Sequence, residues 1–235
     1  MQNFRNAGTI AFDADDTLWH NESLFTITQD KFKKLLSPYH SDEWIESRLF
    51  DTETRNIQHF GYGVKGFTLS MIETAVELSE GRVSGSEIAE IIGFAKEMLL
   101  APTELLDHVK ETIEELSKTR SLMIITKGDL FDQESKIARS GLAEYFEKVE
   151  IVKEKDDAVY RNILTKHRID PNDFVMIGNS LRSDILPVIR LGAAAIHVPY
   201  HTTWARELVD DAELAEYSFH RASGMDEVRR MFDGP

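Results

Sequence analysis

Strand-like and helix-like segments alternate along the second half of this chain, and this alternation limits the fold more than any other feature. Short apolar runs typical of buried strands occur within residues 121–126, 173–178 and 194–198, and residues 148–152 predict a further short strand. Amphipathic patterns typical of helices occur at residues 102–118, 130–140, 156–167, 183–191 and 225–232. Strands joined by helices pair in parallel, so we expect an α/β fold whose core is a doubly wound, Rossmann-like parallel sheet. The first of these helices is expected to begin at Pro102, because proline suits a first helical turn.

A helical block separates this region from an earlier strand. The apolar run Gly8–Asp13 predicts that strand, and no further strand pattern precedes Pro102. Four amphipathic helices are expected between them, at residues 22–37, 41–59, 66–80 and 84–100. The sequence therefore predicts an α/β core of residues 1–18 and 101–235 with a helical insertion of residues 19–100.

Composition excludes several classes of protein. The net charge of −14 argues against a general nucleic-acid binder, which needs a basic face. The absence of cysteine excludes disulfides, zinc thiolates and thiol nucleophiles. No apolar run approaches the ~18 residues that cross a membrane, and the apolar stretch near the N-terminus is too short for a signal peptide. We therefore expect a cytoplasmic protein that binds neither nucleic acid nor membranes.

The first predicted strand ends in a cluster of carboxylates. Ile10–Phe12 continue directly into Asp13-Ala14-Asp15-Asp16-Thr17. Carboxylates in such a place typically hold a divalent cation such as Mg²⁺, and a carboxylate left free beside the metal is a plausible nucleophile. If the extended conformation continues, Asp13 and Asp15 lie on the same side of the chain. The alternative is an acidic turn in which Asp15 or Asp16 only caps a helix.

Polar residues follow three more of the predicted strands at their carboxyl ends. They are Thr126 and Lys127, Lys153 and Lys155, and Asn179 and Asp184. Taken singly, each has a simpler role as a helix cap, a solvated charge or a favourable charge in a first helical turn. In open parallel sheets, however, ligand sites form where the carboxyl ends of the strands meet a switch in strand order. Their shared position therefore predicts that they converge on one site.

This combination of motifs resembles the haloacid dehalogenase-like superfamily, which consists largely of phosphatases. Its four motifs are matched by Asp13–Thr17 (the pattern D-x-D-x-T), by Thr126, by Lys155 and by Gly178–Asp184. The helical block at residues 19–100 then resembles the cap that the family inserts between its first two motifs. The resemblance implies a doubly wound core with an inserted α-helical cap.

The same resemblance implies Mg²⁺-dependent hydrolysis of a small phosphorylated metabolite through an aspartyl-phosphate intermediate. Asp13 would be the nucleophile, and Asp15 would protonate the leaving oxygen and then activate the hydrolytic water. The phosphoryl group would be bound by Thr126, Lys127 and Lys155. The metal would be bound by Asp13, Asp184, the backbone carbonyl of Asp15 and, as a further candidate, Asn179.

Three positions leave alternatives open. Lys153 competes with Lys155 for the third motif, and we favour Lys155 because the run that follows it resembles the start of the family's next helix. Asn179 stands where the family usually has an aspartate, so we expect it to supply an uncharged ligand and weaker Mg²⁺ binding. Lys65, in a glycine-rich stretch of the helical block, is either a contact for a substrate anion or part of a flexible surface turn.

Other functions fit parts of the pattern. A haloacid dehalogenase of the same superfamily needs no metal and lacks an acid two residues after its nucleophile, so Asp15 argues against it. A phosphonate hydrolase would use a cap lysine, for which Lys65 is the candidate. A catalytically silent binding or regulatory protein is opposed by the intact set of motif residues.

Two further interpretations concern side chains outside the motifs. His197 and His201 flank Pro199 near a strand end, and we expect separate surface histidines rather than a ligand pair. Phe131 is expected to belong to the hydrophobic core.

Overall fold

The structure is a computed structural model that describes residues 4–233, and these residues form two compact units. The core unit comprises the residues up to Glu22, Thr103–Lys127 and the residues from Gln133 onward. The helical unit comprises Ser23–Pro102 and Gly128–Asp132. Within residues 4–233, no helix combines the length and apolar character needed to span a membrane.

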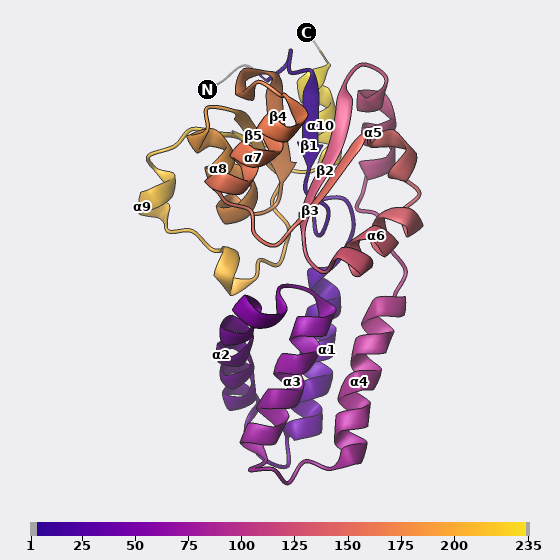
Figure 1. Cartoon of the computed structure of the whole chain (residues 1–235), viewed down its shortest axis with the longest axis vertical. Helices are drawn as coiled ribbons and strands as arrows, with labels where there is room; N and C mark the ends of the chain where they lie inside the picture. The colour runs from indigo at the N-terminus through magenta and orange to yellow at the C-terminus, as the bar shows by residue number, and fades with distance from the viewer. Residues whose placement is uncertain (1–3, 234–235) are drawn as a thin grey trace. The chain divides into compact units, whose positions relative to one another are not determined.

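The core unit is built on a six-stranded parallel sheet of order β3-β2-β1-β4-β5-β6. Figure 1 labels its first five strands along the chain, β1 to β5. The strands are β1 (Thr9–Phe12), β2 (Ser121–Lys127), β3 (Lys148–Val152), β4 (Phe174–Gly178), β5 (Ala194–His197) and β6 (His220–Arg221). The order reverses at β1, which pairs with β2 on one side and β4 on the other. The predicted parallel α/β sheet is confirmed, whereas the two-residue β6 was too short to give a sequence pattern.

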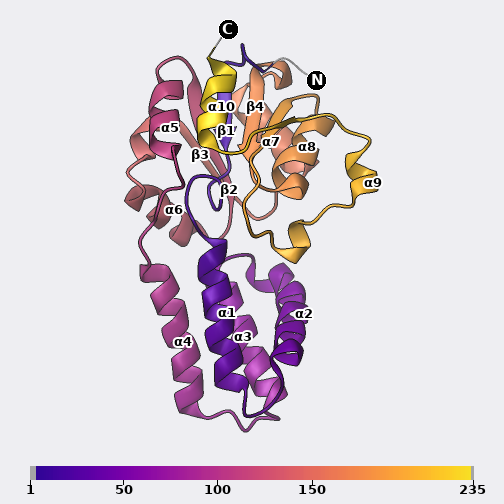
Figure 2. The ribbon, with the colours of Figure 1, turned by 180° about the vertical axis from the view of Figure 1, so that it is seen from behind.

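Helices cover both faces of this sheet. They are α5 (Val109–Ser117), α6 (Leu130–Arg139) and α10 (Met225–Phe232) against one face, and α7 (Asp157–His167) and α8 (Leu186–Arg190) against the other (Figure 2). Ile10 and Phe12 of β1 pack in the first of these cores, and Ala11 between them packs in the second. Burial on both faces explains why the central strands β1 and β4 consist of unbroken apolar runs, whereas the edge strand β3 is partly exposed and alternates with polar residues.

Shorter helical turns connect these elements. They are Ala143–Tyr145, Pro171–Asp173, the π-helical turn Leu181–Ile185, Ala205–Glu207 and α9 (Asp211–Leu214). The predicted helix over residues 183–191 is therefore divided into a π-helical turn and α8.

Helix α5 begins at Val109, so the prediction of a helix from Pro102 is wrong. The preceding residues run extended beside the segment that follows β1: Leu105 bridges to Trp19, and the His20 N–H donates to the Glu104 carbonyl at 3.0 Å. His108, at φ 61°, then turns the chain into the helix. Pairing with a distant segment overrides the local helical pattern here.

The helical unit contains four long helices close to the predicted positions. They are α1 (Glu22–Leu36), α2 (Asp42–Phe60), α3 (Val64–Leu78) and α4 (Gly85–Leu100). Ser84 and Glu87 form a capping box at the start of α4, and Ser41 caps α2 by accepting from the Trp44 N–H. Phe32 and Met71 are fully buried among the apolar side chains that hold the helices together. That this unit acts as a cap stays a prediction.

Candidate active site

Asp13 lies at the end of β1 with its carboxylate buried. Its N–H donates to the Ile177 carbonyl at 2.9 Å, so β1–β4 pairing continues past the strand and fixes the aspartate backbone. The residue is 7% exposed. Its Oδ1 accepts from Lys155 Nζ at 2.5 Å, and its Oδ2 accepts from Thr17 Oγ1 at 3.0 Å. Two donors therefore fix the orientation of this carboxylate.

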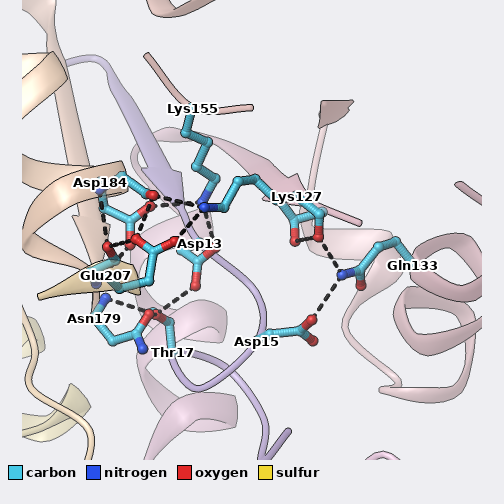
Figure 3. A network of polar contacts seen from close by, with 12 residues as sticks. Asp13, Asp15, Thr17, Lys127, Gln133, Lys155, Asn179, Asp184 and Glu207 are labelled. Carbon is cyan, nitrogen blue, oxygen red and sulfur yellow. Dashed lines mark hydrogen bonds and ion pairs between the residues drawn. The ribbon is translucent and has the colours of Figure 1, made fainter. Parts of the chain in front are cut away.

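Lys155 joins Asp13 to a second buried carboxylate. Its ammonium also donates to Asp184 Oδ1 at 2.7 Å, and its side chain is 1% exposed (Figure 3). Although burial opposes it, attraction to Asp13 and Asp184 raises the pKa of Lys155 above its ordinary value, so the lysine is charged. Lys153, by contrast, is exposed. The structure thus brings Lys155, and not Lys153, to the end of β1.

The Asp13–Lys155–Asp184 cluster holds two carboxylates against one ammonium. Burial raises the pKa of Asp13 to about 7, against the opposing effect of Lys155 and with a contribution from Asp184. A nearby cation would offset the excess of negative charge that remains when both carboxylates are ionised. This cluster is therefore suited to an additional positive group.

The residues at this cluster fit Mg²⁺ as oxygen donors. Among residues 4–233, no three His, Cys, Asp or Glu side chains lie close enough together to surround a metal ion. The expected donor set needs only two carboxylates, from Asp13 and Asp184, with the backbone carbonyl of Asp15. Mg²⁺ prefers oxygen ligands and usually keeps several waters, so one or two protein carboxylates are sufficient.

Asp184 reaches the cluster because the chain after β4 turns back closely on the end of that strand. It lies in the π-helical turn Leu181–Ile185, and its Oδ2 accepts from the Ser180 N–H at 2.9 Å. A Cβ added at Gly178 would lie 2.3 Å from Asp184 Oδ2, far inside van der Waals contact. The glycine at position 178 is required by this close approach.

Thr17 links the first motif to the fourth. Its hydroxyl donates to Asp13 and accepts from the Asn179 N–H at 3.1 Å. Asn179 is thereby held beside Asp13 through its backbone, and its side-chain Oδ1 lies 3.3 Å from the same hydroxyl. Whether Asn179 binds the metal stays a prediction.

His197 contacts the backbone of Asn179, and the prediction that it lies at the surface is wrong. It is 8% exposed at the end of β5, and its Nε2 lies 3.0 Å from the Asn179 carbonyl. Burial lowers the pKa of His197 below its ordinary value, which favours the neutral ring. His201 is exposed, as expected.

Asp15 faces a different set of partners. Lys136 Nζ lies 3.1 Å from both of its oxygens, Gln133 Nε2 donates to Oδ2 at 2.8 Å, and Trp19 Nε1 donates to Oδ1 at 2.7 Å. Figure 3 shows the Asp15 side chain directed toward Gln133 and apart from Lys155. The Asp15 carboxylate is thus held by its own set of donors, none of which belongs to the Asp13–Lys155–Asp184 cluster.

Gln133 and Lys136 were missed by sequence reasoning. They lie three residues apart on α6, a spacing that places two side chains on one helical face. That face follows the predicted Thr126 motif, so the spacing was the available signal. Nothing in the sequence distinguished it from an ordinary polar face of a surface helix.

The remaining predicted residues lie at the end of β2 or in the helical unit. Thr126 is buried, and Lys127 Nζ pairs with Glu207 Oε1 at 2.5 Å. Within the helical unit, Lys65 Nζ donates to Asp129 Oδ1 at 2.9 Å, and contact of Lys65 with a substrate stays a prediction. Phe131 is 73% exposed, so its expected place in the core is wrong. It lies in the first turn of α6, ahead of the buried residues of that helix.

Comparisons of the sequence and of the structure with known proteins indicate the same family. Residues 7–192 match the model of the haloacid dehalogenase-like hydrolases. The structure is similar to a haloacid dehalogenase-like family hydrolase from Xanthomonas campestris, with 37% identity, a TM-score of 0.81 and coverage of 97% of this chain and 93% of the other. A hydrolase from Bacillus subtilis solved with bound magnesium covers 97% of this chain and 100% of its own, at a TM-score of 0.69 and 13% identity. This second likeness shows the fold alone.

Sequence similarity extends to named phosphatases over part of the chain. N-acylneuraminate-9-phosphatase from Mus musculus is 28% identical over 129 residues, and the enzyme from Homo sapiens is 27% identical over the same length. The match covers 52% of this chain and 52% of each relative. The chain therefore matches about half the length of these relatives.

The close contact at position 178 gives a testable prediction. Gly178→Ala should displace Asp184 and weaken Mg²⁺ binding, measured by isothermal titration calorimetry, roughly tenfold or more, which corresponds to about 1.4 kcal/mol. Gly93→Ala is the matched control, because a Cβ there meets nothing within 4 Å. The control should bind Mg²⁺ as the wild type does. Unchanged Mg²⁺ binding in a folded Gly178→Ala protein would show that Asp184 does not contribute to a metal site.

Proposed function

The chain belongs to the haloacid dehalogenase-like hydrolase family, and from that premise we propose that it is a Mg²⁺-dependent phosphatase of a small phosphorylated metabolite. The observation that carries the proposal is the buried Asp13–Lys155–Asp184 cluster at the carboxyl ends of the strands. A nucleophilic carboxylate held against a charged lysine suits attack on a dianionic ester, because the lysine offsets negative charge on both groups.

In the proposed first step, an oxygen of Asp13 attacks phosphorus and the bond from phosphorus to the ester oxygen breaks. Asp15 gives a proton to the departing oxygen, so the leaving group departs as an alcohol. Lys155 and the hydroxyl of Thr17 orient the Asp13 carboxylate. Lys155, with Thr126 at the end of β2, would then bind phosphoryl oxygens, which makes these two residues part of the catalytic set.

In the proposed second step, Asp15 takes a proton from water, and that water attacks phosphorus of the aspartyl-phosphate. Phosphate leaves and the Asp13 carboxylate is restored, so one difficult displacement is divided into two. Gln133, Lys136 and Trp19 hold Asp15 at the edge of the cluster for both proton transfers. A bound Mg²⁺, held by Asp13, Asp184 and the Asp15 carbonyl with Asn179 as a further candidate, would stabilise negative charge on the phosphoryl oxygens.

We propose only a class of substrate, a small phosphorylated metabolite. Since the named relatives are phosphatases of N-acylneuraminate 9-phosphate, that ester is the first to test on this chain. Sugar phosphates, nucleotides and phosphorylated hydroxy acids complete the panel. A generic aryl phosphate, assayed with Mg²⁺ and then with a chelator, tests the activity itself; hydrolysis that is insensitive to the chelator, or none of any ester, would contradict the proposal.

Asp15 distinguishes this proposal from dehalogenation. A halide ion leaves without a proton, whereas an alkoxide needs one, so an acid two residues after the nucleophile is useful only for the ester. Gln133 and Lys136 donate hydrogen bonds to Asp15, which fixes the position of its carboxylate for this role. A haloacid tested beside the phosphate panel should therefore remain unchanged.

The two aspartates should respond differently to substitution. Asp13→Asn should lose turnover of every phosphate ester, because the amide cannot act as the nucleophile. Asp15→Asn should lose roughly 10²–10⁴-fold in the rate of leaving-group departure from an alkyl phosphate, and far less from an ester with a strongly acidic leaving group. Pre-steady-state kinetics across leaving groups of different pKa measure this.

An exposed aspartate provides the control for these variants. Asp211→Asn, in α9, should retain wild-type rates with all of the esters. If Asp15→Asn lost as much rate with a strongly acidic leaving group as with an alkyl phosphate, the division of roles between the two aspartates would be wrong.

A further inference from the structure

Glu207 joins three parts of the core unit that are far apart in the sequence. Its Oε1 accepts from Lys127 Nζ, at the end of β2, at 2.5 Å. Its Oε2 accepts from the hydroxyls of Ser183, at 2.6 Å, and Ser180, both from the segment after β4. The side chains of Lys127 and Glu207 are 15% and 14% exposed. The ion pair is thus largely buried, and both carboxylate oxygens have donors (Figure 3).

The two serines connect Glu207 to Asp184. The Ser180 N–H donates to Asp184 Oδ2 at 2.9 Å, and the Ser180 hydroxyl accepts from the Ser183 N–H at 3.0 Å. The π-helical turn that contains Ser183 and Asp184 is an uncommon conformation, and such turns often occur at functional sites. Because Glu207 accepts from the hydroxyls of both Ser180 and Ser183, it fixes this turn although it lies in a different segment of the chain.

We propose that Glu207 and Lys127 form a brace that positions the turn carrying Asp184, and that Glu207 is a positioning residue for this site. The inference rests on the proposed function only in taking the Asp184 site as the one where the reaction occurs. The brace sets where Asp184 stands, and through Asp184 it sets the position of Lys155. Glu207 contacts Lys127, Ser180 and Ser183, so we assign it a role through the turn and no part in the reaction itself.

The alternative to a brace is that Lys127 binds the substrate phosphate. If Lys127 binds the substrate phosphate, Glu207 is an internal anion that occupies the lysine until the substrate replaces it. The contacts favour the brace, because displacing Glu207 would break the hydrogen bonds that both serine hydroxyls donate to its carboxylate, as well as the ion pair. Although burial opposes it, Lys127 and the serine hydroxyls hold the pKa of Glu207 below its ordinary range, so the ion pair is formed near neutral pH.

Hydrogen exchange tests the brace without any assay of activity. In Glu207→Gln and in Lys127→Met, the amides of Ser183 and Asp184 should lose protection, whereas amides of α7 should keep theirs. Glu213→Gln is the matched control, since it removes an exposed ion pair with Arg190 in the neighbouring segment. It should leave the Ser183 and Asp184 amides protected. Wild-type protection of these amides in Glu207→Gln would overturn the proposal.

Binding of Mg²⁺ and inorganic phosphate provides the second readout. Each single variant should weaken Mg²⁺ binding roughly 10- to 100-fold in calorimetry, as loss of a partner that orients a metal ligand does. The double variant should be no weaker than the worse single one, because either substitution already breaks the brace. In contrast, Glu207→Gln that binds inorganic phosphate more tightly than wild type would show that Glu207 competes for Lys127, and would overturn the brace.

A milder variant covers the case in which Glu207→Gln does not fold. Ser183→Ala removes one of the two hydroxyls that Glu207 binds and leaves both the ion pair and the acceptors of the turn's backbone N–H groups in place, so it too should lower protection at Asp184. Full protection at Asp184 would overturn the brace. The outcome is separable from the proposed function. If the wild type hydrolyses no phosphate ester, the phosphatase proposal fails, while the exchange data still decide whether the brace exists.

Discussion

The candidate site depends on one buried ion cluster, in which Lys155 holds the carboxylates of Asp13 and Asp184 together. Burying a charge costs free energy unless the charge is paired, so these three buried residues must contact one another in the folded chain. The sheet order achieves this. β1 and β4 are neighbours, which brings Asp13 beside the turn that carries Asp184, and the long lysine side chain spans from beyond β3. The switch in strand order at β1 is therefore the structural basis of the site.

The main features of the fold and the motif positions could be predicted because both follow from local patterns. Apolar runs mark buried strands, and polar residues directly after parallel strands must meet at one edge of the sheet. This reasoning located Asp13, Lys155 and Asp184, whose contacts the structure describes. It also preferred Lys155 to Lys153 on the basis of the helix that follows.

The remaining features depend on contacts between distant segments, which leave no local pattern. Pairing of Leu105 with Trp19 delays the start of α5 to Val109. Gln133 on α6 holds Asp15, and Glu207 in the segment after β5 holds Lys127, yet neither follows its strand directly. Residues that support a site from outside therefore escape a search limited to strand ends.

Chemical trapping of the aspartyl-phosphate is the decisive experiment for the proposed mechanism, because only a covalent mechanism places phosphate on the enzyme. The protein is quenched in acid during turnover of a phosphate ester, reduced with borohydride to convert an acyl phosphate to an alcohol, and digested for peptide mass spectrometry. We expect a modified residue at Asp13 that is absent without substrate and absent in Asp13→Asn. Steady turnover with an unmodified Asp13, or with the modification on a different residue, would contradict it.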